Sequence, residues 1–345
     1  MTSLLVFREP GRTWAALAGT PFSCEYEIQN LTVALDHRPR WTGSRFIAPI
    51  TQIDKNVRAA FVSLNKERAQ GHTQALTQGL LDFKPQMRLH EGQKVSVECL
   101  TEPRESKGPK LKLLDANPKG ATGCTLDTSD AVKTLFKTHR KKVDKIICNA
   151  PETLRVIAAW NSGCPAQLVR NDDPLWQAFH DCIAEVRARD VALKGGAWLK
   201  FEQVSTLSAI DVNAGPLDPR QANMLAIPVL ARQLTLRNIA GLIVIDALAM
   251  NNIEHRQAFD KALAAHLELP KGDISPMDKR GVVTLHRARR GFSLAELEDE
   301  NFKALDFLSQ ALHDPGAFDS IPTDYKKRFD GPLAPAFAEA KRRTL

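Results

Sequence analysis

Several features that mark large classes of protein are missing from this sequence. No apolar run approaches the roughly 18 residues of a membrane-spanning helix, so no membrane partner is expected. Residues 1–9 lack the charged start and the long apolar stretch of a signal peptide, and we expect them to form a β-strand of a cytoplasmic protein. There is also no internal repeat and no low-complexity linker. We therefore expect a globular protein that is neither secreted nor embedded in a membrane.

Cysteine is present, but not in the pattern that binds zinc. The six cysteines form no C-x-x-C pair, which is the usual basis of a thiolate zinc site, so no structural zinc is expected. Isolated thiols are typical of proteins in a reducing compartment. The six are Cys24, Cys99, Cys124, Cys148, Cys164 and Cys182.

Length and charge narrow the possibilities further. A chain of 345 residues is too long for one ordinary core, which favours two or three domains. The 47 basic residues outnumber the 40 acidic ones, and the formal net charge of +7 favours a polyanionic partner.

The first third of the chain has the pattern of a small β-barrel. Residues 43–64 predict two strands around a polar turn, and apolar and polar residues alternate at 93–100. A basic turn at 104–114 then leads into another strand. Short strands joined by basic turns suggest a barrel, and OB-folds are the barrels that bind nucleic acids.

The next segment, 116–142, is rich in small and polar residues and ends in a basic cluster. This cluster is either a solvated helix face or a contact for RNA phosphates. Beyond it, strand and helix signals alternate over 144–189, which indicates an α/β unit. The cluster consists of Lys137, His139, Arg140, Lys141 and Lys142.

Two aspartates, Asp211 and Asp246, each end an apolar strand, and a predicted helix at 220–237 lies between the strands. A right-handed strand-helix-strand unit brings such strand ends together. Two converging carboxylates repel unless a cation neutralises them, and Mg²⁺ suits such a pair. Asn213 lies on the same side of an extended chain as Asp211. The alternative is that both aspartates are helix N-caps or turn residues.

Three segments resemble the catalytic core of the ribonuclease E/G family. They are "GGAWLKFEQVSTLSAIDVNAG", "VLARQLTLRNIAGLIVIDALAM" and "KRGVVTLHRARRGFSL", and they contain both aspartates in order. Residues 43–64, 91–111 and 144–154 resemble earlier parts of the same family. The resemblance therefore covers most of residues 1–295.

The resemblance implies a multidomain α+β and α/β fold. It contains a ribonuclease H-like subdomain with an inserted OB-fold β-barrel, followed by a DNase I-like catalytic α/β subdomain. The implied boundaries are 1–38 for the N-terminal strands of the ribonuclease H-like subdomain, 39–115 for the RNA-binding barrel, 116–142 for a shortened connector, 143–194 for the rest of the ribonuclease H-like subdomain, 195–292 for the catalytic subdomain and 293–345 for a helical tail.

By the same resemblance, the protein is a metal-dependent endoribonuclease. Asp211 and Asp246 would hold catalytic Mg²⁺, with Mn²⁺ as an alternative, and Asn213 would complete the catalytic set. The substrate would be single-stranded RNA, cleaved to 5′-phosphate and 3′-hydroxyl ends in RNA processing or turnover, with ribosomal RNA maturation among the implied roles.

The resemblance also implies residues that bind RNA. Phe61 matches a base-stacking aromatic, although a core aromatic is the alternative. Lys107 matches a basic contact, with Lys110 and Lys112 in the same stretch. Arg287 and Arg289 alternate along a strand and could meet phosphates, or simply keep the surface soluble.

The chain departs from the family pattern in several places. The V-R-T segment of a 5′-monophosphate sensor is missing from 116–142, so we expect little preference for 5′-monophosphorylated RNA. The C-P-x-C zinc link is missing after Ser293, so any oligomer is not expected to be zinc-linked. Ser205 replaces a glutamate, Leu248-Ala249-Met250 replaces I-D-M, and a second stacking aromatic has no match near residues 72–76. The rival hypotheses are a non-catalytic RNA- or ribosome-binding protein and a metal phosphodiesterase for small substrates.

Overall fold

The chain is described by a computed structural model and divides into two compact units. One unit contains Met1–Val33, Leu135–Ala288 and Phe292–Leu345, and the other contains Ala34–Thr134 and Arg289–Gly291. The structure describes residues 1–19, 27–38, 40–66, 75–83, 87–104, 107–128, 130–160, 163–171, 173–270, 272–289, 291–314 and 316–344. Cys24 and residues 72–74 of the segment without a stacking aromatic lie outside the described residues.

The larger unit begins with a five-stranded sheet of order β11-β10-β1-β2-β3. The opening strand β1 pairs antiparallel with β2 and parallel with β10, which in turn pairs parallel with β11. These strands contain the expected opening strand and the strands expected near 144–150 and 166–170. Their bounds are Thr2–Glu9 for β1, Arg12–Gly19 for β2, Glu27–Leu35 for β3, Lys145–Cys148 for β10 and Ala166–Leu168 for β11.

Helix α1 (Ala131–His139) precedes β10, α2 (Pro151–Trp160) follows β10, and α3 (Pro174–Arg187) follows β11. The ring of Phe7 on β1 lies 4.9 Å from that of Trp176 on α3, and both side chains are buried. The apolar face of α3 thereby packs on the sheet.

The smaller unit is a closed β-barrel, as the alternation of apolar residues predicts. Its strand order is β5-β6-β8-β7-β4-β9, and a further pairing between β5 and β4 closes the barrel. The core contains Phe46, Val62 and Val97, all fully buried. β9 pairs with β4, so part of the segment expected as a connector belongs to the barrel sheet. The strands are β4 (Arg45–Asp54), β5 (Ala59–Lys66), β6 (Ala75–Asp82), β7 (Lys94–Cys99), β8 (Lys110–Asp115) and β9 (Gly123–Leu126).

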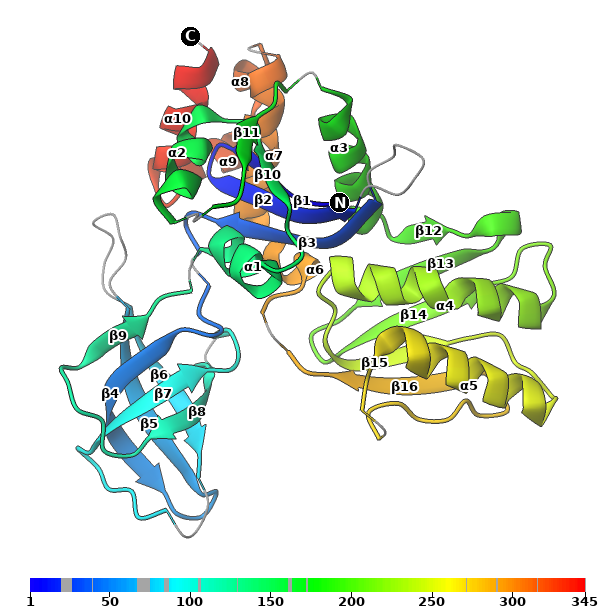
Figure 1. The fold of residues 1–345 in the computed structure, drawn as a ribbon, viewed down its shortest axis with the longest axis horizontal. Helices are drawn as coiled ribbons and strands as arrows, with labels where there is room; N and C mark the ends of the chain where they lie inside the picture. The colour runs from blue at the N-terminus through cyan, green and yellow to red at the C-terminus, as the bar shows by residue number, and fades with distance from the viewer. Residues whose placement is uncertain are drawn as a thin grey trace. The chain divides into compact units, whose positions relative to one another are not determined.

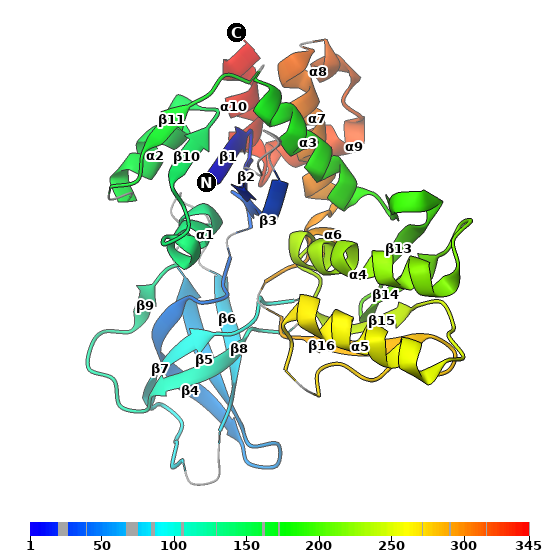
Figure 2. The same cartoon turned by 45° about the vertical axis from the view of Figure 1, so that its right-hand side comes forward.

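A second five-stranded sheet in the larger unit, of order β12-β13-β14-β15-β16, carries the two aspartates. Only β14 and β15 are parallel neighbours, and helix α4 connects them. Helices α4 and α5 lie on one face of this sheet (Figures 1 and 2). The elements are β12 (Asp190–Ala192), η1 (Lys194–Gly196), β13 (Trp198–Gln203), β14 (Leu207–Asn213), α4 (Pro219–Leu236), β15 (Gly241–Asp246), α5 (Ile253–Leu267) and β16 (Val282–Arg287).

The chain after Ser293 is mostly helical, and its helices pack on the rest of the larger unit. Gly11, in the turn between β1 and β2, has φ +74°. A Cβ there would lie 2.7 Å from Leu305 and 2.6 Å from Ala336. No helix in the described part of the chain has the length and apolar character needed to cross a membrane. The tail contains α6 (Leu294–Leu297), α7 (Glu300–His313), α8 (Ala317–Ser320), α9 (Thr323–Lys326), η2 (Lys327–Asp330) and α10 (Ala334–Thr344).

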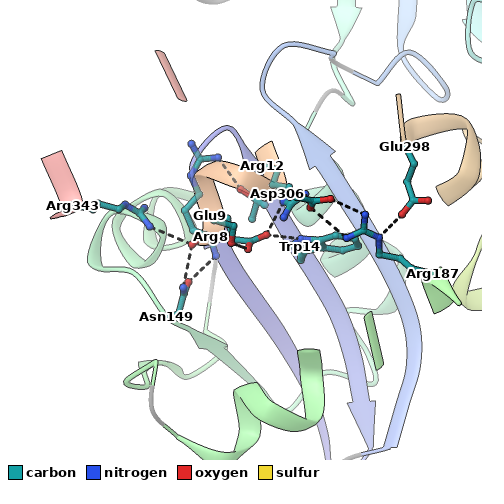
Figure 3. A network of polar contacts seen from close by, with 11 residues as sticks. Arg8, Glu9, Arg12, Trp14, Asn149, Arg187, Glu298, Asp306 and Arg343 are labelled. Carbon is teal, nitrogen blue, oxygen red and sulfur yellow. Dashed lines mark hydrogen bonds and ion pairs between the residues drawn. The ribbon is translucent and has the colours of Figure 1, made fainter. Parts of the chain in front are cut away.

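A buried polar network joins the β1–β2 hairpin to this tail (Figure 3). The Arg12 guanidinium donates from Nε to Glu9 at 2.7 Å and from Nη1 to Asp306 at 2.6 Å. Asp306 also accepts from Arg187 at 2.7 Å, and Trp14 donates to Glu9 at 2.8 Å. Segments almost 300 positions apart are therefore held by charge-assisted hydrogen bonds.

Candidate active site

Asp211 and Asp246 are direct neighbours in the second sheet. They are register partners across the parallel strands β14 and β15, which places their backbones roughly 4.8 Å apart. Partners in register point to the same face, so the two carboxylates share one side of the sheet. Asp211 is half-buried and Asp246 is exposed, so both can reach solvent. The helix between the two strands brings together side chains that are far apart in the chain.

The helix caps of this region are other residues. Asp218 caps α4 and accepts from the backbone N–H of Gln221 at 3.1 Å. Asn252 caps α5 and accepts from that of Glu254 at 2.7 Å. The alternative in which Asp211 and Asp246 cap helices is therefore wrong, because both lie within strands.

Asn213 lies beside the Asp211 carboxylate, as the two-residue spacing predicts. Its amide Nδ2 donates to Asp211 Oδ2 at 2.8 Å. The chain then turns at Gly215, which has φ +55°, and a Cβ there would lie 2.2 Å from the Gly196 carbonyl oxygen. Only glycine tolerates both the left-handed backbone and this close approach. The strand end that carries Asp211 and Asn213 is thus held against the Gly195–Gly196 turn.

The strand end that carries Asp246 is held by two features. Ala247 N donates to the Gly281 carbonyl oxygen at 3.2 Å, and a Cβ on Gly281 would lie 2.0 Å from the Ala247 carbonyl oxygen. Asn223, fully buried on α4, donates to Leu248 O at 2.8 Å and accepts from Leu248 N at 3.0 Å. Asn223 therefore fixes the backbone two residues after Asp246. We did not predict this role, since a lone asparagine within a helical pattern carries no signal for it.

The donor set fits a hard cation. Carboxylate oxygens at two adjacent strand ends, open to solvent, match the way Mg²⁺ binds through one or two carboxylates while keeping waters. In the described part of the chain, no hydrogen bond or ion pair engages the Asp246 carboxylate. Nor do the described residues contain a group of three or more His, Cys, Asp or Glu side chains that could hold a metal. The arrangement thus suits an open site with two protein carboxylates.

In the barrel, the predicted RNA-binding residues lie on its outer surface. Phe61 on β5 is half-buried, whereas its neighbours Ala60 and Val62 point into the core. Phe61 pairs with Leu80 of β6, and Leu80 pairs with Lys110 of β8, so the three side chains form one row on the outer face. The alternative in which Phe61 is a core aromatic does not fit this placement.

The three lysines of the basic stretch are exposed. Lys107 lies in a turn bridged to Arg104, and Lys110 and Lys112 flank the buried Leu111 on β8. The backbone at Gly108 packs closely against β6. Only glycine fits there, because a Cβ would lie 1.5 Å from the Gln78 carbonyl oxygen. The basic turn is therefore held against β6.

The two arginines predicted to contact RNA, Arg287 and Arg289, are placed differently from the expectation. Arg287 lies on the face that α4 covers, and its Nη1 donates to the carbonyl oxygens of Leu234 and Ile239, each at 2.8 Å. It therefore satisfies backbone acceptors at the end of α4, on the opposite face from Asp211. Strand β16 ends at Arg287, so Arg289 follows the strand and does not alternate within it.

Comparison with known proteins agrees with this geometry. The profile of the "Ribonuclease E/G family" matches residues 114–290, more than half of the chain. This range includes the two aspartates and Asn213, but not Phe61 or the three barrel lysines.

Individual relatives are similar over shorter stretches. "Ribonuclease E" of Nostoc sp. is 31% identical over 169 residues, which cover 45% of this chain and 24% of the relative. "Ribonuclease G" of Salmonella typhimurium is 34% identical over 117 residues, covering 31% of this chain and 24% of the relative. A "Ribonuclease E/G-like protein" of Porphyra purpurea is 32% identical over 163 residues, covering 44% and 31%.

The matched stretches span less than a third of the length of these relatives. The family profile, however, covers the sheet, both aspartates and the helix between them. On these grounds the chain belongs to the ribonuclease E/G family.

Proposed function

We propose that this protein is an endoribonuclease that cleaves single-stranded RNA with the help of Mg²⁺. The observation that carries the proposal is the register pairing of Asp211 with Asp246, with Asn213 hydrogen-bonded to Asp211 at 2.8 Å. The names of the relatives, ribonucleases E and G, support the same activity.

The proposed reaction is hydrolysis of a phosphodiester. A water molecule attacks phosphorus, the bond from phosphorus to O3′ breaks, and a proton reaches the leaving O3′, so the ends are a 5′-phosphate and a 3′-hydroxyl. Bound Mg²⁺ supplies Lewis-acid activation of water and positive charge beside the phosphate. Asp211 and Asp246 would hold that ion, and Asn213 would orient the Asp211 carboxylate through its amide hydrogen bond.

We assign the subdomains to match the family. The strand order β11-β10-β1-β2-β3 supports a ribonuclease H-like subdomain, and the sheet with α4 and α5 supports a DNase I-like catalytic subdomain. The closed barrel supports an OB-fold whose outer row of Phe61 and Lys110 binds a single strand by stacking and phosphate neutralisation.

The test is incubation of the purified protein with a 5′-labelled single-stranded RNA, with Mg²⁺, with Mn²⁺ and with EDTA. We expect metal-dependent internal cleavage. The downstream product should carry a 5′-phosphate, so it should be ligated without prior phosphorylation. RNA binding without cleavage in either metal would reject the proposal in favour of a non-catalytic RNA-binding protein.

A further inference from the structure

The sheet that carries Asp211 and Asp246 has one face packed under helices and one face open to solvent. On the packed face, residues such as Leu199, Ile210 and Ile245 are fully buried. Every residue of the opposite face is exposed or half-buried along the five strands, all of which are described. This open face therefore has room for a ligand beside the two carboxylates.

Two side chains of β13 extend the site on that face. Lys200 is the register partner of Asp211, and Trp198 is the partner of Asn213. Partners across an antiparallel pair have Cβ atoms about 4.5–5.5 Å apart, so Asp190, Lys200, Asp211 and Asp246 form one row across four strands. Trp198 and Asn213 form the next row, at the edge of the sheet where β13 begins and β14 ends.

Lys200 is placed to balance charge. Two carboxylates offset the two charges of Mg²⁺, so a phosphodiester bound there needs a further cation to be neutralised. Lys200 is the only lysine or arginine on the open face of the five strands, as their register shows. In the described part of the chain, no hydrogen bond or ion pair engages its ammonium group. Lys200 lies in register between the carboxylates of Asp190 and Asp211, and its ammonium group pairs with neither of them, so it can turn towards a ligand on the open face.

Trp198 presents an exposed aromatic ring next to the row that contains Lys200, Asp211 and Asp246. Its exposed fraction is 38%, whereas Trp14, Trp41 and Trp176 are buried at 8% or less. An exposed indole on a sheet face can stack on a nucleobase, an interaction that single-strand-binding proteins use repeatedly.

We propose that Lys200 and Trp198 bind the RNA at the cleavage site. The Lys200 ammonium contacts a non-bridging oxygen of the scissile phosphate, and Trp198 stacks on the base of an adjacent nucleotide. The proposal rests on the endoribonuclease function proposed above and names the residues that position its substrate. No proton transfer is assigned to Lys200, which acts by its charge on the phosphate.

RNA fits this face better than a second copy of the chain does. A tight self-contact here would bury Asp211, Asp246 and Lys200, and buried carboxylates are costly unless each is paired. A nucleotide presents what the face complements, namely a flat base for Trp198 and a phosphate for Lys200.

The first experiment measures binding in EDTA, so that no variant cleaves. Tryptophan emission is followed as a short oligouridylate is added, and we expect saturable quenching that Trp198→Phe removes while affinity stays within about threefold. Trp198→Ala should weaken binding about tenfold, as loss of one stacked base does. An abasic oligomer of equal length should bind wild type without quenching. Equal quenching in wild type and Trp198→Phe would overturn the role of Trp198.

The second experiment measures cleavage. Lys200→Met should lower kcat about a hundredfold with little change in KM, because the lost charge acts mainly on the transition state. Lys200→Arg should restore much of the rate. The control is Lys261→Met, which removes an exposed lysine from helix α5 and should cleave like wild type. Wild-type kcat in Lys200→Met would overturn the role of Lys200.

The outcomes separate this inference from the proposed function. If wild type does not cleave RNA in any metal, the function fails, and the quenching experiment still decides whether Trp198 binds a base. If wild type cleaves and all four variants at positions 198 and 200 match it, the inference fails alone. Concentration-dependent self-association that shifts the Trp198 emission to the blue would also overturn it. Thermal unfolding identifies misfolded variants, and the conservative Phe and Arg changes then decide.

Discussion

Two carboxylates on adjacent strands repel each other, and Asp211 and Asp246 are held together by the sheet despite that cost. A cation removes the repulsion, which is why the arrangement favours a metal. The neighbouring carboxylate Asp218 has a different role, because it caps α4 through a backbone hydrogen bond. The helix-capping role of Asp218 thus differs from the metal-binding role proposed for Asp211 and Asp246.

The first prediction is that Asp211→Asn and Asp246→Asn each abolish cleavage while leaving the fold intact. Asparagine keeps the size of the side chain but removes the charge that holds the metal. Loss of metal activation should lower the rate roughly a thousandfold or more. Single-turnover cleavage in Mg²⁺, with circular dichroism as the test of folding, measures this.

Asp218→Asn is the matched control for these variants. Asparagine caps helices about as well as aspartate, so this variant should cleave at the wild-type rate and unfold at a similar temperature. Wild-type rates in both Asp211→Asn and Asp246→Asn would return these two aspartates to structural roles.

A second prediction concerns Asn223, the buried amide that binds both polar groups of the Leu248 backbone. Asn223→Leu should lower the free energy of unfolding by about 1–3 kcal/mol, because a buried N–H and a buried C=O lose their partner. It should also lower kcat, since the backbone after Asp246 is no longer fixed. Urea unfolding and cleavage kinetics measure the two effects.

Gln221→Ala, at an exposed position of the same helix, is the control and should change neither quantity appreciably. If Asn223→Leu is as stable and as active as this control, then the hydrogen bonds to Leu248 do not position Asp246.

At the scale of elements, a glycine allows a close backbone approach at one end of the sheet that carries Asp211 and Asp246. Gly281 immediately precedes β16, opposite the end of β15 that carries Asp246. Its φ of +98° and the nearby Ala247 carbonyl oxygen both exclude a Cβ. The end of β15 can therefore depend on a glycine just before the neighbouring strand β16.

The third prediction is that Gly281→Ala destabilises the protein and impairs cleavage far more than Gly272→Ala. Both glycines have positive φ, +98° and +103°, but a Cβ on Gly272 would meet nothing within 4 Å. The backbone strain is therefore shared, and the difference isolates the contact with Ala247. Thermal unfolding of both variants measures it. Equal losses would mean that φ alone explains the effect.

The barrel leads to a fourth prediction, on salt. Lys107, Lys110 and Lys112 are exposed, and each phosphate they neutralise releases a counterion. The slope of log affinity against log salt should therefore become shallower by about 0.7 for each lysine that contacts RNA, when that lysine is changed to alanine. Fluorescence anisotropy with a labelled oligonucleotide at several salt concentrations measures the slope. An unchanged slope in the triple variant would exclude these lysines from the RNA contact.

At the scale of the whole chain, the larger unit is tied together by the network of Figure 3. Glu9 and Arg12 are 6% and 4% exposed. Arg12 pairs with Asp306 of α7, and Asp306 also accepts from Arg187 of α3. Burial by itself would raise the pKa of Glu9, but Arg12 and the hydrogen bonds to the carboxylate outweigh burial and lower it below its ordinary value. The contacts between the β1–β2 hairpin and helix α7 therefore depend on an ionised Glu9.

The fifth prediction follows from the sign of that shift. Because the folded pKa of Glu9 is lowered, its stabilising contribution is complete above the ordinary glutamate pKa and is lost as pH falls through the folded value. Arg12→Leu should cost about 3–5 kcal/mol at neutral pH, since Glu9 becomes an unpaired buried carboxylate. Burial then raises the Glu9 pKa, so this variant should gain stability on mild acidification.

Urea unfolding of wild type and Arg12→Leu between pH 7 and pH 4 tests whether the variant gains stability over a range in which Glu9 keeps its full contribution in wild type. The control is Arg45→Leu, which breaks an ion pair with Glu98 whose arginine side chain is 49% exposed, and it should cost less than about 1 kcal/mol. Parallel pH dependence in wild type and Arg12→Leu would show that Glu9 is not governed by Arg12.

Much of the sheet that carries Asp211 and Asp246, with its helices, could be predicted from local patterns. The apolar run before Asp246, the strand before Asp211 and the helix between them were predicted within a few residues, because periodicity and strand composition are local properties. The outcome was poorer for Arg287, whose predicted RNA contact differs from its observed hydrogen bonds to Leu234 and Ile239. Which face of a strand is covered is not a local property.

By itself, then, the sequence determined the family, the order of strands and helices around Asp211 and Asp246, and the alternation that makes the barrel. Only the tertiary structure decided that Asp211 meets Asp246 in register, that Asn223 fixes the loop at Leu248, and that Lys200 lies opposite Asp211. The physical reason is that composition and periodicity act over a few residues. Strand register and helix packing, in contrast, bring together side chains from distant parts of the chain, and a shift of one residue would turn each of them to the other face.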